Sequence, residues 1–227
     1  MSRYRRANAK GGVFFFTVVL ADRPSNLLIE EIDRLRRIYR EVQNRRPFET
    51  IAVCILPDHI HALWALPEHD TDFSTRWSLI KSGFSRGIDA KPRSKSKIYK
   101  REKGIWQRRY WEHAIRDDAD LEKHVDYIHF NPVKHGHVTR VMDWPHSSFH
   151  RFVERGLLAA DWGGDLGDIA GLFGERTVGT LRFAHPTRSV QGRAGDGASR
   201  RAQARRAWYD ACDEMVATKT KTGGSCR

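Results

Sequence analysis

The chain has 227 residues and seven tryptophans, and 40% of its residues are hydrophobic, so it can bury the core of one substantial domain. A net charge of +12 and an isoelectric point near 10.0 indicate a surface that attracts polyanions, most commonly nucleic acid. Three scattered cysteines (Cys54, Cys212 and Cys226) argue against a zinc ribbon and a disulfide framework, and they fit a reducing compartment.

An apolar run at residues 13–20 follows several arginines and superficially resembles a signal peptide. It is short, rich in Phe and Val, and lacks a small-residue cleavage site, so we expect a buried first strand instead. No other segment approaches membrane-spanning length, and there is no basic amphipathic helix of the lipid-binding kind. We therefore expect a cytoplasmic protein without a membrane partner.

Hydrophobic periodicity and capping residues predict the elements in chain order. They are strand 13–20, helix 26–42, strand 48–56, strand 59–66, helix 73–88, strand 105–115 and a helix from 118 to 131. Asp72 is expected to cap the second helix and Asp117 or Asp118 the third, which should end at Asn131 because Pro132 cannot continue it.

This order predicts an α+β fold with a ferredoxin-like split βαβ antiparallel sheet, in which the first and third strands are central, plus one additional helix. We expect this domain to span residues 1–162. Residues 163–227 are basic and rich in Gly and Arg, and they predict a partly disordered tail with one helix near 198–216.

The most informative motif is the triplet His59-Ile60-His61. In a strand, residues two apart project from the same face, so both imidazoles point the same way and can hold one metal ion. Taken alone, the pair is more often two sheet histidines satisfied by hydrogen bonds.

The last predicted helix carries a second group of polar residues. At 100° per residue, Asp120, His124, Tyr127 and Asn131 fall in one narrow stripe, separate from a neighbouring apolar stripe. If this stripe covers the sheet near the histidine pair, Asn131 adds an oxygen ligand and Tyr127 a hydroxyl nucleophile. Taken separately, Tyr127 is a tyrosine at the core margin and Asn131 a helix-ending residue.

A bound metal ion would allow these residues to catalyse attack of the tyrosine on a phosphate. A tyrosine hydroxyl with a pKa near 10 is a poor nucleophile at neutral pH, and a divalent ion can withdraw charge from a phosphate that it attacks. Attack would form a covalent phosphotyrosine, which keeps the energy of the phosphodiester for rejoining. Imidazole ligands and a phosphate substrate together lead us to expect Mg²⁺ or Mn²⁺.

A basic segment at residues 85–109 offers a surface for DNA, with ten basic and two acidic residues. Tyr99, Trp106, Tyr110 and Trp111 are interleaved near it and could stack on unpaired bases. The expected DNA-binding residues are Arg3, Arg5, Arg6, Arg86, Lys91, Arg93, Lys95, Lys97, Lys100, Arg101, Lys103, Trp106, Arg108 and Arg109. The simpler alternatives are a solvated loop and tryptophans that belong to the core.

Several motifs in the same order resemble the REP-associated tyrosine transposases, bacterial relatives of the HUH single-strand transposases. The resemblance spans residues 3–162 and lies in the segments 4–6, 11–17, 56–61, 105–113, 127–134 and 144–149. It implies an HUH nuclease fold with His59 and His61 as the histidine pair, Tyr127 as the nucleophile and Asn131 at the position of a polar third ligand.

The resemblance also implies cleavage and joining of single-stranded DNA beside REP hairpins, leaving a 5′-phosphotyrosine and a free 3′-OH, in association with the bacterial nucleoid. Two other functions stay open: a non-catalytic DNA-hairpin binder, and a metallo-phosphoesterase that uses a metal-activated water. The target sequence, the native metal, the choice between monomer and dimer, and the role of the tail are not determined by the residues.

Overall fold

A computed structural model of the chain describes residues 12–163. Within these residues, 12–151 and 160–163 belong to one compact unit and 152–159 to a second. The expected tail and its helix near 198–216 lie outside the described residues, so the domain boundary at 162 stays a prediction.

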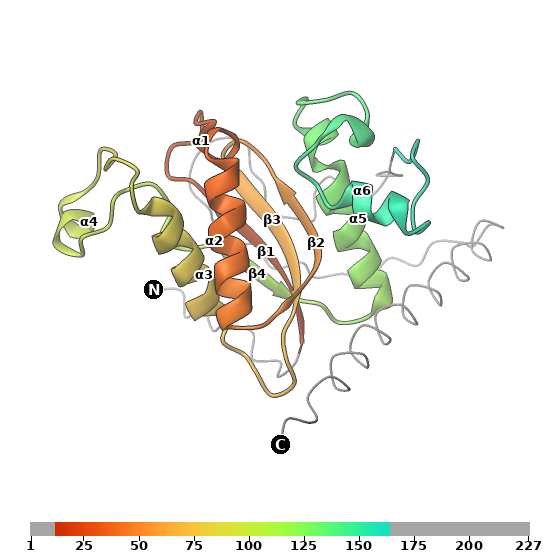
Figure 1. Ribbon diagram of the computed structural model, residues 1–227, viewed down its shortest axis with the longest axis horizontal. Coiled ribbons are helices and arrows are strands. Elements are labelled where there is room, and N and C mark those ends of the chain that lie inside the picture. The colour runs from red at the N-terminus through yellow and green to blue at the C-terminus, as the bar shows by residue number, and fades with distance from the viewer. Residues whose placement is uncertain (1–11, 164–227) are drawn as a thin grey trace, which may run out of the picture. The chain divides into compact units, whose positions relative to one another are not determined.

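Four strands form one antiparallel sheet: β1 (Val13–Val19), β2 (Glu49–Ile55), β3 (His59–Ala65) and β4 (Trp111–Ala114). Their order across the sheet is β2-β3-β1-β4, so β1 and β3 are central (Figure 1). This confirms the predicted α+β, ferredoxin-like arrangement. It also places the histidines of β3 on a strand that is paired on both sides.

Helices cover both faces of this sheet. Helices α2 (Ile32–Arg45) and α3 (Phe73–Ser85) lie on one face, and α5 (Asp118–Lys134) lies on the other (Figure 1). The shorter elements are α1 (Leu27–Glu30), α4 (Lys95–Tyr99), the 3₁₀ turn η1 (Val141–Asp143) and α6 (Phe149–Glu154). Within residues 12–163, no helix has both the length and the apolar composition needed to cross a bilayer.

The predicted caps form. Asp72 accepts a hydrogen bond from the backbone N of Thr75 at 3.0 Å, and Asp117 accepts one from the backbone N of Asp120 at 2.8 Å. Each carboxylate thus satisfies a backbone donor that the first turn of its helix leaves unpaired. Of the two residues expected to cap α5, Asp117 and Asp118, it is Asp117 that forms the cap.

Two predicted elements are shorter or interrupted. The helix expected at 26–42 is split at Glu31, and its first turn is tied to the turn before β3 by a 3.2 Å hydrogen bond from Leu28 N to Pro57 O. The strand expected at 105–115 forms only over Trp111–Ala114. Before β4 the segment forms only an isolated antiparallel bridge between Trp106 and Leu20, and the carbonyl oxygens of Gln107 and Arg108 accept hydrogen bonds from Lys81 at 2.6 and 3.4 Å.

The expected end of the last helix is wrong. Helix α5 continues through Pro132 to Lys134. The backbone N of His135 bonds Asn131 O at 3.0 Å, and that of His137 bonds Pro132 O at 2.9 Å. Because Pro132 lies in the final turn, it removes one hydrogen bond near the end of the helix, and the rest of the turn still forms.

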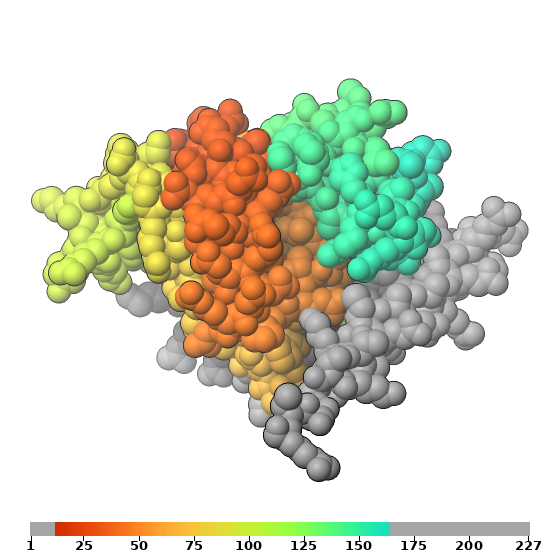
Figure 2. Space-filling view, viewed as in Figure 1, coloured from red at the N-terminus to blue at the C-terminus, as the bar shows by residue number. Residues whose placement is uncertain are grey.

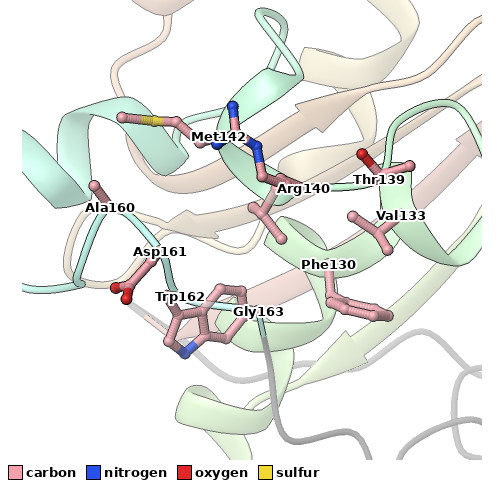
Figure 3. Close-up of a pocket in the computed structure, with 10 residues that line it drawn as sticks. Phe130, Val133, Thr139, Arg140, Met142, Ala160, Asp161, Trp162 and Gly163 are labelled. Carbon is pink, nitrogen blue, oxygen red and sulfur yellow. The ribbon is translucent and has the colours of Figure 1, made fainter.

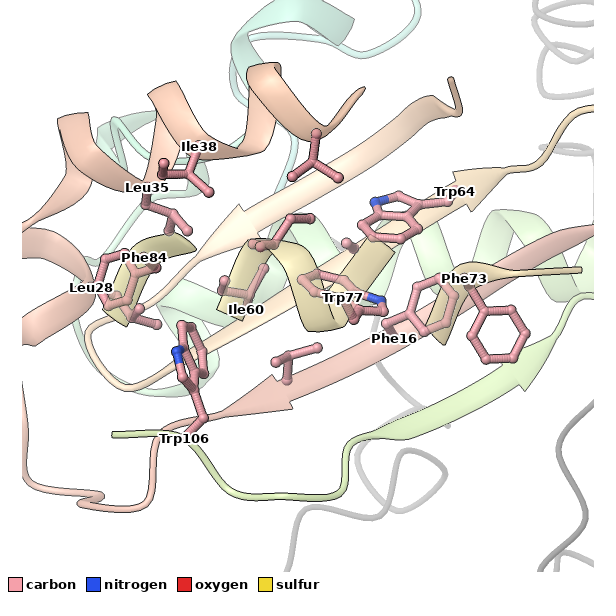
Figure 4. Close-up of a cluster of buried hydrophobic side chains, with 14 of the residues drawn as sticks. Phe16, Leu28, Leu35, Ile38, Ile60, Trp64, Phe73, Trp77, Phe84 and Trp106 are labelled. Carbon is pink, nitrogen blue, oxygen red and sulfur yellow. The ribbon is translucent and has the colours of Figure 1, made fainter. Parts of the chain in front are cut away.

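The apolar core fills the space between the sheet and helices α2 and α3 (Figure 4). Trp64 of β3 stacks on Trp77 of α3, with ring centroids 4.3 Å apart, and Phe16 of β1 lies 4.9 Å from Trp64. All three side chains are fully buried. This core anchors the two central strands whose opposite side carries the histidines.

Candidate active site

The histidine pair lies on the face of β3 that α5 covers. His61 is opposite Thr17 of β1 and Cys54 of β2 in the antiparallel register. His59 and His61 are 2% and 0% exposed, and their ring centroids are 4.8 Å apart. Strand alternation therefore brings the two imidazoles together, as the sequence predicts.

Each histidine is oriented by a hydrogen bond at Nδ1. His61 Nδ1 lies 3.0 Å from Thr17 Oγ1, and His59 Nδ1 lies 2.7 Å from Asp58 Oδ1. A metal-binding histidine typically engages its second nitrogen in this way, which directs Nε2 at the ion. Thr17 and Asp58 were missed by the sequence reasoning, although Asp58 is adjacent to the triplet.

Asp58 is itself held in place. Arg23 Nε lies 2.9 Å from its other carboxylate oxygen. Partial burial raises the pKa of Asp58, but the hydrogen bond to His59 and the charges of His59 and Arg23 outweigh it, so the pKa lies below its usual range. The carboxylate is therefore ionised at neutral pH and can accept a hydrogen bond from His59 Nδ1.

Tyr127 of α5 reaches the same place. It is 2% exposed, and its ring lies 5.2 Å from that of His61, at an interplanar angle of 69°. Phe15 of β1 supports both, because its ring centroid is 5.5 Å from that of His61 and 6.0 Å from that of Tyr127. The predicted stripe of α5 thus covers the sheet at the histidine pair.

Asn131 follows Tyr127 by one helical turn and is fully buried. Its Nδ2 donates to Tyr127 O at 3.3 Å, and within the described residues no donor lies at its buried Oδ1. A buried amide oxygen without a donor is costly, and a bound cation would remove that cost. Two imidazoles and this oxygen fit a divalent ion with positions left open for substrate.

Lys134 is a further contact that the sequence reasoning missed. Its Nζ lies 3.3 Å from the phenolic oxygen of Tyr127 and 4.8 Å from the centre of the ring. Lys134 is seven residues after Tyr127, so two helical turns return it to the same side of α5. Because the helix was predicted to end at Asn131, Lys134 was not placed on the same side of it as Tyr127.

A second polar cluster lies at the start of α5. His113 of β4, Asp120 and His124 bring possible ligand atoms within 4.8 Å of one another. His113 Nε2 lies 2.8 Å from Asp120 Oδ2, to which Arg116 Nε also donates at 3.1 Å. The two imidazole rings are parallel to within 12°, so their lone pairs do not converge on one point without a ring rotating. We interpret the cluster as a hydrogen-bonded support for α5.

Burial sets the charge states of this cluster. It lowers the pKa of His124 to about 4, so this imidazole is neutral at pH 7. Burial raises the pKa of Asp120, but hydrogen bonds from His113 and Arg116 outweigh it and the pKa falls to about 2. Sequence reasoning placed Asp120 and His124 in the right stripe but left His113 without a role, because it comes from a different element.

The basic flap, defined here as residues 86–109, links α3 to β4 and contains α4. It stands out beside α3, on the opposite side of the sheet from α5 (Figures 1 and 2). Lys103 Nζ donates to Ile88 O at 2.7 Å, and Arg108 Nε donates to Glu102 at 3.0 Å, which hold the flap together. Its candidate basic residues are exposed except the half-buried Lys97.

The aromatic residues of the flap differ in exposure. Tyr99 is 88% exposed and is free to stack on a base, whereas Trp106 is only 7% exposed. Trp106 belongs to the apolar core, with its ring 5.4 Å from that of Phe84. This burial contradicts the expectation that Trp106 contacts DNA, and the apolar alternative is correct. Arg3, Arg5 and Arg6 lie outside the described residues.

A cavity of about 320 Å³ lies beside α5, next to Phe130 and Val133 (Figure 3). Phe130, Met142 and Trp162 contribute apolar walls, and Arg140 and Asp161 contribute charges. The residues lining it do not include the histidine pair, Tyr127 or Asn131. The cavity is therefore separate from the group of residues proposed for chemistry.

Comparison with known proteins finds matches among transposases. A family model described as "Transposase IS200 like" matches residues 16–131, from the first strand to Asn131. A REP-associated tyrosine transposase of Escherichia coli is 48% identical over 178 residues, which are 78% of this chain and 99% of the relative. A protein of Haemophilus influenzae assigned to the same group is 51% identical over 167 residues, 73% of this chain and 95% of the relative.

A solved structure of a protein from the same group is also similar to this chain. It is a REP-associated tyrosine transposase bound to a REP hairpin, with 48% sequence identity and a TM-score of 0.67. The similarity covers 79% of this chain and 100% of that chain.

Proposed function

The chain belongs to the IS200-like transposase family and, within it, to the REP-associated tyrosine transposases, and on that premise we propose that it cuts and rejoins single-stranded DNA through Tyr127. The observation that carries this proposal is the placement of the Tyr127 ring 5.2 Å from His61, with the buried Asn131 one turn along the same helix. A nucleophile and a metal-ligand set share one buried position.

The site residues have different roles in the proposed reaction. His59, His61 and Asn131 would hold Mg²⁺ or Mn²⁺, which supplies Lewis-acid polarisation of the scissile phosphate when bound. The phenolic oxygen of Tyr127 attacks phosphorus, its proton passes to water, and the 3′ oxygen leaves and is protonated. The products are a 5′-phosphotyrosine and a free 3′-OH, and attack by a 3′-OH reverses the step.

Thr17 and Asp58 orient the imidazoles for this role, at 3.0 and 2.7 Å from the respective Nδ1 atoms. All of these residues belong to one chain, so one protomer contains a full set of groups. This favours cleavage by Tyr127 of the same subunit whose histidines bind the metal.

The substrate is a REP-type hairpin with a single-stranded flank. The related solved structure is bound to a REP hairpin, and the basic flap here offers a matching positive surface with Tyr99 exposed. Because the flap and α5 lie on opposite sides of the sheet, the DNA must extend across the protein to reach both (Figure 1). Binding should weaken steeply with salt as phosphate contacts release counterions. A protein with this substrate would act on chromosomal DNA, so we propose that it is located in the cytoplasm, at the bacterial nucleoid.

The decisive experiment incubates the protein with a REP-type hairpin carrying a labelled single-stranded flank, in Mn²⁺ or Mg²⁺. We expect a covalent protein–DNA adduct that resists denaturation and is lost in Tyr127→Phe. Tyr99→Phe is the matched control, because it removes only the hydroxyl of an exposed tyrosine and keeps the ring that could stack on a base, so the adduct should still form.

Other outcomes identify the alternative functions. Cleavage that persists without an adduct in Tyr127→Phe indicates a metal-activated water. Salt-sensitive binding without cleavage in either metal indicates a hairpin-binding protein that lacks catalysis.

A further inference from the structure

Lys134 is a cationic side chain of α5 that contacts the phenolic oxygen of Tyr127. Its Nζ donates to that oxygen at 3.3 Å and also lies 4.8 Å from the ring centre. The hydrogen bond and the cation–π contact restrain the ammonium group at the oxygen. Lys134 is itself exposed, so its stem is not held in place by burial in the core.

Helix α5 sets the spacing that makes this contact possible. Tyr127 and Lys134 are seven residues apart, close to two full turns, so they project from the same side. The continuation of α5 through Pro132 is necessary, because a helix ending at Asn131 would not carry Lys134 back to the tyrosine. The last turn of α5 therefore positions a charge at the nucleophile.

That oxygen is where negative charge changes during the proposed reaction. In cleavage, the phenol loses its proton to water as its oxygen bonds to phosphorus and the bond to the 3′ oxygen breaks. In rejoining, the 3′ oxygen bonds to phosphorus and the bonding electron pair returns to the phenolic oxygen. A donor at this atom lowers the barrier in both directions, because the transition state is shared.

We propose that Lys134 is a catalytic residue that donates a hydrogen bond to the phenolic oxygen of Tyr127 and stabilises the charge on it during attack and departure. This inference rests on the proposed function, since it requires Tyr127 to be the nucleophile. A competing role is binding of a DNA phosphate, which would act on affinity and not on the chemical step.

The test compares Lys134→Met, Lys134→Arg and Lys123→Met. Lys123 is an exposed lysine of the same helix and serves as the matched control. Single-turnover formation of the covalent adduct is measured at saturating REP-type hairpin DNA and Mn²⁺, together with DNA affinity and thermal unfolding. Rejoining is measured by adding a 3′-OH strand to the isolated adduct.

We expect Lys134→Met to slow adduct formation on the order of 10²-fold, as loss of one donor at a developing oxyanion does. Rejoining should slow by a similar factor, leaving the balance between adduct and rejoined DNA nearly unchanged. Lys134→Arg should recover most of the rate, and Lys123→Met should match the wild type. Unfolding temperature and DNA affinity should change no more in Lys134→Met than in Lys123→Met.

Three results would overturn the role of Lys134 while leaving the nucleophile intact. They are an unchanged rate in Lys134→Met, a loss that saturating DNA restores, and a slowing of cleavage without slowing of rejoining. If the wild type forms no adduct, or if Tyr127→Phe still forms it, the proposed function fails and this inference fails with it.

Discussion

The two faces of the central strands differ sharply, although they are made by neighbouring residues. On one face of β1 and β3, Phe16 and Trp64 pack with Trp77 in a fully apolar core. On the other face, Thr17 and His61 are also buried but are polar and hydrogen-bonded to each other. Strand alternation allows one strand to serve both environments.

This difference indicates which face stabilises the fold. Burying large apolar side chains contributes a few kcal/mol each, whereas a buried hydrogen-bonded pair contributes little net stability. The apolar face therefore offsets the cost of burying two imidazoles and an amide on the catalytic face. Changes on the first face should act on folding, and changes on the second should act on metal binding and chemistry.

The largest expected effect on stability comes from the apolar face. Trp77→Ala should lower the free energy of unfolding by about 3–5 kcal/mol, because it removes the ring that stacks on Trp64 and leaves a cavity. Tyr127→Phe on the catalytic face should change it by under about 1 kcal/mol. Urea unfolding monitored by circular dichroism measures both, and equal losses would contradict the division between the faces.

A smaller effect should appear in acid and comes from the catalytic side of the sheet. The folded pKa of His124 is about 4, below the usual value near 6.5, because burial disfavours its charged form. The unfolded chain therefore binds the proton first as the pH falls, and the stability present above pH 6.5 is lost toward pH 4. Between pH 7 and 5 this one group should cost on the order of 2 kcal/mol.

Urea unfolding at several pH values measures this loss, and His124→Gln is the informative variant. Its stability should fall less between pH 7 and 5 than that of the wild type, whatever its stability at pH 7. Parallel curves for the two proteins would show that His124 does not contribute to the acid sensitivity.

The smallest effect on folding should accompany a clear effect on metal binding. Thr17→Val keeps the shape of the side chain but removes the hydroxyl at His61 Nδ1, and losing such an orienting partner typically weakens metal binding 10- to 100-fold. Calorimetric titration with Mn²⁺ measures the affinity. Thr17→Ser keeps the hydroxyl and should bind nearly as the wild type does, so equal affinities for Val and Ser would show that Thr17 does not orient His61.

Much of the site could be predicted because it depends on local periodicity. The two-residue alternation of β3 put His59 and His61 on one face, and the helical stripe put Tyr127 and Asn131 on one side of α5. Asp117 marked the start of that helix by its capping position. Hydrogen bonds between different elements, such as that between Thr17 and His61, could not be predicted because no pattern of neighbouring residues indicates them.

Two predictions failed for different reasons. Trp106 was predicted on a DNA surface because it lies among basic residues, but its ring packs in the core beside Phe84. Pro132 was predicted to end a helix that its neighbouring hydrogen bonds continue. For Trp106 the tertiary environment outweighed a tendency read from adjacent residues, whereas for Pro132 the cost of one lost hydrogen bond in the last turn was too small to end the helix.

The amino-acid sequence by itself determined the order of strands and helices, the shared face of the histidine pair and the basic character of the flap. These follow from backbone periods of 2.0 and 3.6 residues and from charge, which neighbouring residues specify. Only the tertiary structure decided that Phe15 joins His61 to Tyr127, and that Lys134 reaches the tyrosine oxygen. Such contacts depend on how a helix packs on a sheet built from distant segments, and that packing is set by the whole core.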